Sequence, residues 1–211
     1  MKFTLTHVHA LSELVRLDMM TLEEYCKHGD SFFTGRLQRF YQEYKAEPET
    51  WDEDHAVDMR NELQTHREYN AYFGLMMAYS SFEQYLQRLY TYTGHVATIP
   101  ALRDVIFQPP TRMVLEEFGR FLRAVGIKIS DPPYEWNKII KLHALRNAIA
   151  HQGGEVTREN ENRLKPFGYK LGDDIKATID DVLENIRLVR ETAEMLTKDY
   201  VKIMREKKLL K

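Results

Sequence analysis

Leu145-Arg146-Asn147-Ala148-Ile149-Ala150-His151-Gln152-Gly153-Gly154 places an Arg-Asn pair before a short apolar run, a histidine and two glycines. The glycines can adopt the left-handed conformation that ends a helix. Upstream, Asp131-Pro132-Pro133 is typical of a helix start, with a capping Asp and Pro in the first turn. We therefore predict a helix over about residues 132–151, with Arg146, Asn147 and His151 in its last turns.

The spacing of these three residues constrains any site that uses them together. Asn147 and His151 are four apart and share one face of a helix. Arg146 and His151 are five apart, which puts them roughly 140° from each other around an ideal helix. A site that uses both side chains therefore requires a distorted helix end or a contribution from a second subunit.

The residue types suit phosphodiester chemistry. An arginine stays charged and can direct two N–H donors at a phosphate. A histidine can transfer a proton near neutral pH, and the negative end of the helix dipole favours the protonated imidazolium at His151. Asn147 can orient His151 or donate a hydrogen bond to a ribose or phosphate oxygen.

Arg-Asn-x-x-x-His at the end of an apolar helix, followed by Gly and a long helix, resembles the motif of the HEPN family. The resemblance covers about residues 70–205. It implies a small all-helical domain whose Arg146 and His151 form a metal-independent ribonuclease site, with Asn147 in support, at a homodimer interface. It also implies RNA as substrate, no cofactor, and a toxin–antitoxin, phage-defence or RNA-processing setting with an antitoxin or other regulatory protein as partner.

The resemblance also implies a mechanism and leaves an alternative. The ribose 2′-hydroxyl would attack the adjacent phosphate while Arg146 stabilises the developing charge and His151 transfers the proton. The alternative is a catalytically inactive HEPN-like module that keeps the motif for dimerisation or for binding a partner or nucleotide. In one branch of the family a Tyr stands two residues after the His; Gly153 stands there in this chain, so that branch's partner nucleotidyltransferase is not expected.

Composition indicates a globular protein. Hydrophobic residues make up 43% of the chain and aromatic residues 11%, which argues against disorder. The net charge of −2 means that RNA binding has to come from local positive patches. The single cysteine, Cys26, excludes an internal disulfide, and no apolar run approaches a membrane span. We therefore expect a cytoplasmic protein that does not associate with membranes.

Apolar residues recur at helical spacing along the whole chain, which predicts an all-α fold. We expect an up-and-down bundle of about four core helices over residues 51–211, with a helical extension over residues 1–50 packed on it in one compact unit. The expected helices cover 8–29, 33–48, 51–93 with a bend near Gly74, 100–107, 114–125, the motif segment, and a last helix capped by Asp173 or Asp174. Residues 152–172 are rich in Gly and polar residues and are expected to form a loop beside the motif.

Two further polar residues border the expected site. Glu83 lies at the edge of a broad apolar helix face, where a half-buried carboxylate needs a partner. HEPN-like domains often place a polar residue of this helix opposite the motif Arg, so the resemblance implies that Glu83 supports Arg146; an exposed Glu on the helix flank is the alternative. His143 precedes Arg146 by three residues and either touches the site or serves packing.

The loop offers residues for RNA binding. Lys165 and Lys170 can contact phosphate, and Tyr169 and Phe167 can stack on bases. A short hairpin that covers the core would explain the aromatic residues equally well. Metal sites find little support, because the acidic run Asp52–Asp54 is typical of a helix start and His7 and His9 are a poor pair of ligands.

Overall fold

The computed structural model describes residues 5–96 and 115–206, which form an all-α bundle as predicted. Its six α-helices are α1 (Leu5–Ala46), α2 (Glu53–Val96), α4 (Leu115–Val125), α5 (Trp136–Gln152), α6 (Glu161–Leu164) and α7 (Ile179–Glu206). Short 3-10 turns occupy Pro48–Thr50 and Lys165–Phe167. The helix expected over 100–107 lies outside the described residues. Within the described ranges, no helix is both long enough and apolar enough to span a membrane.

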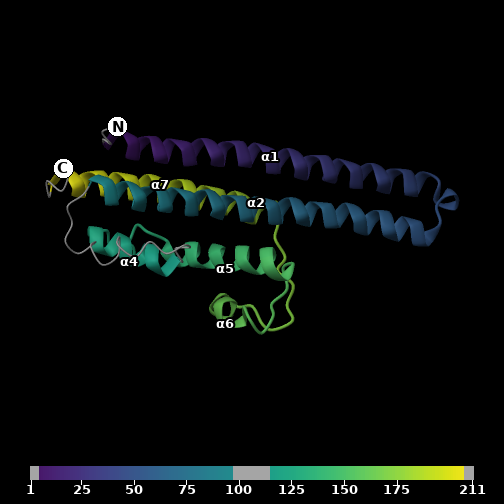
Figure 1. Cartoon of the computed structure of the whole chain (residues 1–211). Helices are drawn as coiled ribbons and strands as arrows, with labels where there is room; N and C mark the ends of the chain where they lie inside the picture. Colours follow the sequence, from purple (N-terminus) through teal and green to yellow (C-terminus); the bar gives the residue numbers. More distant parts are fainter. Residues whose placement is uncertain (1–4, 97–114, 207–211) are drawn as a thin grey trace.

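The helices form layers around α2 (Figure 1). The chain runs out along α1 and returns antiparallel along α2, and α7 packs against both of them. On the other side of α2 lie α4 and α5. Val8, Met19 and Cys26 of α1 are buried in the same core as α2, α5 and α7. Helix α1 therefore packs on the main bundle over residues 8–26.

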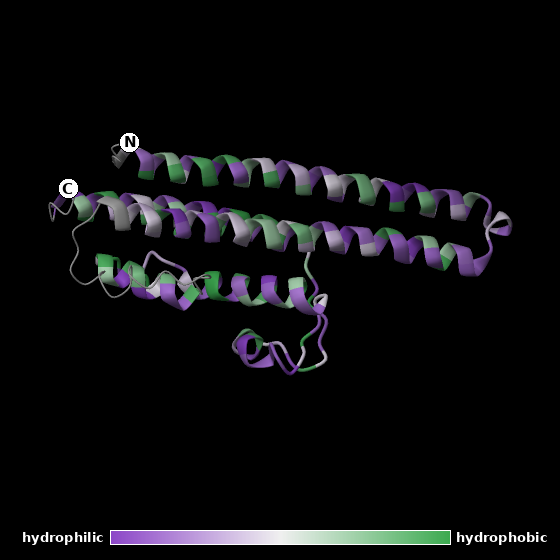
Figure 2. Cartoon of the chain, in the orientation of Figure 1, coloured by the Kyte–Doolittle hydropathy of each residue, from purple (hydrophilic) through white to green (hydrophobic). Residues whose placement is uncertain are grey.

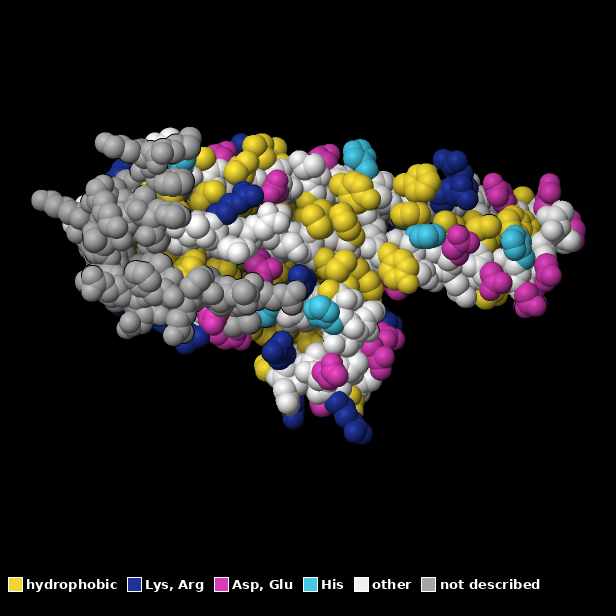
Figure 3. All heavy atoms as spheres, in the orientation of Figure 1, with side chains coloured by type: hydrophobic (Ala, Val, Ile, Leu, Met, Phe, Trp, Pro, Cys, Tyr) yellow, Lys and Arg dark blue, Asp and Glu magenta, His cyan; other side chains and the backbone are white. Residues whose placement is uncertain are grey.

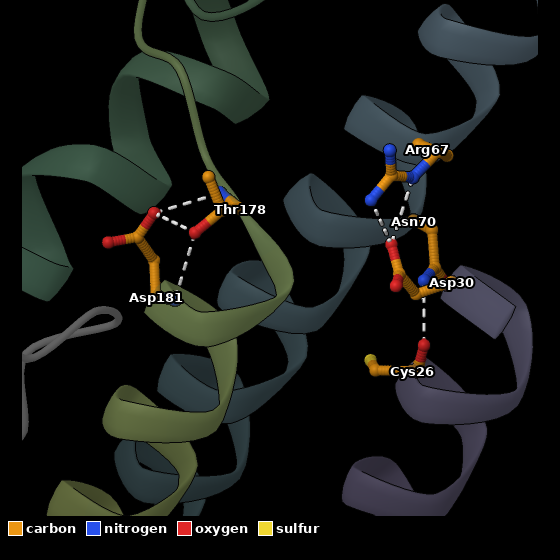
Figure 4. Close-up of polar contacts among 6 residues, drawn as sticks. All are labelled: Cys26, Asp30, Arg67, Asn70, Thr178 and Asp181. Atoms are coloured by element: carbon orange, nitrogen blue, oxygen red, sulfur yellow. Dashed lines mark hydrogen bonds and ion pairs between the residues drawn. The ribbon is translucent and has the colours of Figure 1, made fainter. Parts of the chain in front are cut away.

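The first helix is continuous where the sequence predicted a break near Gly29, and that prediction was wrong. A Cβ on Gly29 would lie 2.6 Å from Asn70 Oδ1. The Asn70 amide donates to the Cys26 carbonyl oxygen at 2.9 Å, and Arg67 pairs with Asp30 at 2.9 Å (Figure 4). Gly29 therefore allows α1 and α2 to approach closely rather than ending a helix.

Gly74 has the same role at the centre of the bundle. Helix α2 runs through it without a break. A Cβ at this position would lie 2.5 Å from Val182 Cγ1 and 2.9 Å from Cys26 Sγ. Three helices thus meet at Gly74, and burial among them raises the pKa of the Cys26 thiol to about 11.

Side-chain caps fix where α2 and α7 begin. The carboxylate of Asp52 accepts from the Asp54 N–H at 3.1 Å, so the acidic run is a helix start as predicted. At α7, Thr178 Oγ1 accepts from the Asp181 N–H at 3.2 Å, and the Asp181 carboxylate accepts from the Thr178 N–H at 2.8 Å (Figure 4). This reciprocal pair places the start of α7 after Thr178. The predicted cap at Asp173 or Asp174 was wrong.

Beyond the body of the bundle, α1 and α2 continue together as a two-helix projection, which we call the arm and define as residues 33–63 (Figure 1). The arm has its own small core of Leu37, Phe40, Ala56 and Leu63, separate from the main one. Trp51 at the tip packs edge-on against Phe40, with ring centroids 5.3 Å apart. The outer part of the arm is largely hydrophilic (Figure 2).

Candidate functional site

The motif helix is regular to its end. It begins at Trp136, four residues later than predicted, because residues 131–133 form a bend and a turn and residues 134–135 are not helical, and it ends at Gln152. Gly153 adopts the left-handed conformation with φ +64°, and its N–H donates to the Ala148 carbonyl oxygen. Arg146 and His151 therefore lie on one continuous helix, roughly 140° apart around its axis.

Three side chains of α5 form a continuous hydrogen-bond chain. Arg146 Nη1 donates to Asn147 Oδ1 at 2.8 Å, and Asn147 Nδ2 lies 2.8 Å from His143 Nε2. The His143 ring stacks on the buried Tyr79 ring of α2, with centroids 4.9 Å apart and planes inclined by 25°. The ring stack with Tyr79 holds His143 in place. The hydrogen bonds from His143 through Asn147 therefore also hold the half-buried guanidinium of Arg146.

The expected ion pair between Glu83 and Arg146 is not formed. Among the ion pairs of the described residues none joins these two side chains, because the guanidinium is held on Asn147 instead. Both charges nevertheless act on Tyr79. Burial is the main cause that raises the pKa of the Tyr79 hydroxyl; Glu83 raises it further and Arg146 lowers it. Glu83 is thus a half-buried neighbour of the site without contacting the motif Arg.

Charged residues of two other helices act electrostatically on the motif. The pKa of His143 is lowered, chiefly by burial, and Arg163 and Arg146 lower it further while Glu116 raises it. Arg163 belongs to α6 and Glu116 to α4, so charges on α4, α5 and α6 act on this histidine. The sequence analysis missed Arg163, Glu116 and Tyr79. Only the arginine could have been suspected, as a cation in the loop after the motif.

His151 lies apart from this network. It is exposed in the last turn of α5, and within the described residues it makes no hydrogen bond or ion pair. Its neighbour Gln152 accepts a hydrogen bond from Asn160 Nδ2 at 3.3 Å. The His151 imidazole is therefore accessible to a ligand from solvent.

The loop after the motif is held in place by Asn160. Asn160 Oδ1 accepts from the Thr157 N–H, and Asn160 Nδ2 donates to the Glu155 carbonyl oxygen, both at 2.9 Å. One isolated antiparallel bridge between Glu155 and Asp174 closes the loop. The loop thus stands at a defined position beside the end of α5.

The loop residues proposed to bind RNA divide into two groups. Tyr169 and Phe167 are half-buried and pack against the main core, which favours the covering role that the sequence left open. Burial raises the pKa of the Tyr169 hydroxyl. Lys165 and Lys170 are exposed and remain available to phosphate.

A separate cavity of about 130 Å³ lies between α5, α7 and this loop. Lys141, Lys176 and Tyr169 are among the residues that line it, and Arg146, Asn147 and His151 are not. Lys138, also at its wall, is already paired with Glu135 and Glu184. The cavity therefore does not belong to the motif.

Comparisons with protein-family models, with curated proteins and with solved structures found no match to this chain. The resemblance to the HEPN family therefore depends on the motif and its all-helical setting. Within residues 5–96 and 115–206, no three His, Cys, Asp or Glu side chains cluster closely enough to hold a metal ion.

Proposed function

We propose that the protein is a metal-independent RNA endonuclease of HEPN type, acting as a toxin or phage-defence effector. The observation that supports this most is the fixed orientation of Arg146, held through Asn147 and His143 on a helix that ends at the exposed His151. A guanidinium held in place can stabilise a developing phosphorane without reorganising during the reaction. A free imidazole can supply the proton.

The reaction needs these groups, the RNA itself and water. The 2′-hydroxyl of a ribose gives its proton to water as its oxygen forms a bond to the adjacent phosphorus, and the bond from phosphorus to the 5′-oxygen of the next nucleotide breaks. Arg146 compensates the negative charge on the phosphoryl oxygens in the transition state. His151 in its protonated form donates a proton to the departing 5′-oxygen. The products are a 2′,3′-cyclic phosphate and a 5′-hydroxyl.

We predict that RNA is cleaved in excess chelator and that the new ends are 2′,3′-cyclic phosphates, because the nucleophile belongs to the substrate. DNA of the same sequence should remain intact because it lacks the 2′-hydroxyl. Mass spectrometry of the products identifies the ends. Activity that disappears with chelator and returns with magnesium, or equal cutting of DNA, would contradict the mechanism. A protein that binds RNA without cutting it would instead be the inactive HEPN-like module.

A hydrophobic surface on α1 and α2 supports a dimer. We call it the aromatic face and define it by Tyr25, Phe32, Tyr69, Phe73 and Met77, which gather over the middle of the two helices (Figure 3). Tyr25, Phe32 and Tyr69 are 60%, 61% and 61% exposed, and the Tyr25 and Phe73 rings lie 5.3 Å apart. Such exposure is unusual for large aromatic residues on a monomer.

The aromatic face reaches the end of the motif helix. The Tyr69 and Tyr72 rings are 6.3 Å apart, and the Tyr72 hydroxyl lies 2.9 Å from where a Cβ of Gly154 would be. A copy that covers the aromatic face therefore borders the turn that follows His151. A two-fold pair would bring the two motif helices toward one interface, which is what the divergent Arg146 and His151 require.

The composition of the aromatic face favours a second copy over RNA as the occupant. Its five defining side chains are all large and apolar or aromatic, and none of them carries a charge. A stable interface buries about 800 Å² of each partner, with aromatic residues and Met enriched at its centre. RNA phosphates, in contrast, are bound mainly by Lys and Arg.

We predict a homodimer at micromolar concentration and a monomer when Tyr69 and Phe73 are both replaced by Glu, because the interface would bury two unpaired carboxylates. Light scattering coupled to size-exclusion chromatography gives the mass. Leu171→Glu is the matched control, since Leu171 is 49% exposed but lies on the loop. A monomeric wild type, or a double variant that stays dimeric, would contradict this assignment.

A further inference from the structure

The chemistry of the groups fixes the direction of the hydrogen-bond chain on α5. A guanidinium has donors only, so the Asn147 oxygen must face Arg146. The Asn147 amide nitrogen then faces His143, and this nitrogen can only donate. His143 Nε2 must therefore be the acceptor and carry no proton. This chain of hydrogen bonds thus requires a neutral His143 with its proton on Nδ1.

We propose that His143 is a positioning residue: as the neutral Nδ1–H tautomer it holds Asn147, and through Asn147 the guanidinium of Arg146, and its protonation releases Arg146. The consequence for catalysis rests on the proposed ribonuclease function. The tautomer and the release are properties of the fold and can be tested without RNA.

Protonation of His143 breaks the hydrogen-bond chain from His143 to Arg146, because N–H groups would then face each other in the contact between His143 and Asn147. A proton on His143 Nε2 would face the Asn147 amide N–H. The Asn147 amide can accommodate it only by turning over and presenting its oxygen to His143. Its nitrogen would then face Arg146, which also only donates, and that hydrogen bond is lost. The orientation of Arg146 and the charge of His143 are thus coupled.

The surroundings of His143 keep it neutral at ordinary pH. The Tyr79 ring of α2 covers one face of the imidazole. Arg146 on α5 and Arg163 on α6 disfavour a second positive charge, and Glu116 on α4 favours it. Burial and the two arginines outweigh Glu116, so the pKa of His143 is lowered from its ordinary 6.5. Nearby Glu83 acts on Tyr79.

The sign of the linked stability follows from this shift. A histidine with a lowered pKa in the folded state binds fewer protons there than in the unfolded chain. Its contribution to stability is therefore present above about pH 6.5 and is lost as the pH falls through the folded-state pKa. We therefore expect Arg146 to be released when the pH falls below the folded-state pKa of His143.

The tautomer can be read by NMR of protein labelled with ¹⁵N at its eight histidines. At pH 7.5, long-range ¹H–¹⁵N spectra should show His143 with a protonated Nδ1 and a bare Nε2, with the signal assigned by its loss in His143→Phe. Exposed His9, which makes no hydrogen bond or ion pair within the described residues, serves as the internal reference and should show a mixture of both neutral tautomers. An Nε2–H or mixed state at His143 would overturn the proposal.

Asn147→Asp supplies the decisive comparison. A carboxylate accepts on both oxygens, so it can hold Arg146 and also receive an N–H from His143. We expect the His143 tautomer to switch to Nε2–H and its titration to move to higher pH by one unit or more. An unchanged His143 signal in this variant would also overturn the proposal.

Activity then separates the two proposals. If wild-type protein cuts RNA, His143→Phe should lower the cleavage rate about tenfold, although its ring can still stack on Tyr79. In wild type, activity should fall in acid as Arg146 is released. In Asn147→Asp that fall should be absent. A loss of activity in acid that is the same in wild type and Asn147→Asp would contradict the coupling. If wild type cuts no RNA but shows the Nδ1–H tautomer and its switch, the ribonuclease proposal fails and the positioning role stands.

Discussion

Replacing Arg146 or His151 with alanine is expected to lower the rate of RNA cleavage roughly 10³-fold or more, because each supplies a separate part of transition-state stabilisation. The melting temperature should stay within about 5 °C of wild type. His151 is exposed and unbonded among the described residues, and Arg146 contributes one hydrogen bond to Asn147. Single-turnover cleavage assays and circular dichroism melts measure the two effects.

Arg187→Ala is the matched control, since it removes an exposed arginine from α7 and should leave cleavage unchanged. If both motif variants cleave normally, the inactive-module alternative replaces the enzyme. If both unfold, the two residues serve the end of the helix rather than chemistry. A loss confined to Arg146→Ala would assign the proton transfer to a residue other than His151.

The second large effect is expected at the crossing of α1, α2 and α7. Gly74→Ala should destabilise the protein by about 1–3 kcal/mol, because its methyl group would overlap Val182 Cγ1 at 2.5 Å and Cys26 Sγ at 2.9 Å. For a chain of this size the melting temperature should fall by roughly 2–12 °C. Adding Val182→Ala should recover part of the loss, and a double-mutant cycle gives the coupling.

Gly35→Ala is the control for this prediction. Gly35 also lies inside a long helix, but nothing stands within 4 Å of a Cβ built on it. Alanine should therefore stabilise the helix by up to about 1 kcal/mol through its higher helix propensity. If Gly74→Ala stabilises the protein as Gly35→Ala does, the close crossing at Gly74 is not as described.

These glycines show where prediction from sequence succeeded and where it failed. The all-α class and the end of the motif helix at Gly153 follow from local signals, namely apolar periodicity and left-handed capping. Gly29 and Gly74 carry the same local signal, but their role depends on Asn70 and Val182, which are far away in the sequence. A missing Cβ is visible in a sequence, whereas the neighbour that requires its absence is not.

The same limit applies to the candidate site. His143 and Asn147 are four residues apart, so their contact could be expected from helical spacing. Arg163 and Glu116 act electrostatically on His143 from other helices, and no local pattern marks them. The expected partner of Arg146 was a carboxylate across the helix pair, but the adjacent Asn147 takes that place. The pairing depended on tertiary distances that a motif does not encode.

The separate small core of the arm has a consequence for how this fold can vary. Residues 33–63 project from the body of the bundle and join it, among the described residues, through the continuing α1 and α2 (Figure 1). Removing or adding seven residues in each helix changes the length of the arm by about 10.5 Å and rotates the remaining side chains by only about 20° around the helix axis. The reach of the molecule can thus evolve in steps of two helical turns while the geometry around Arg146 stays constant.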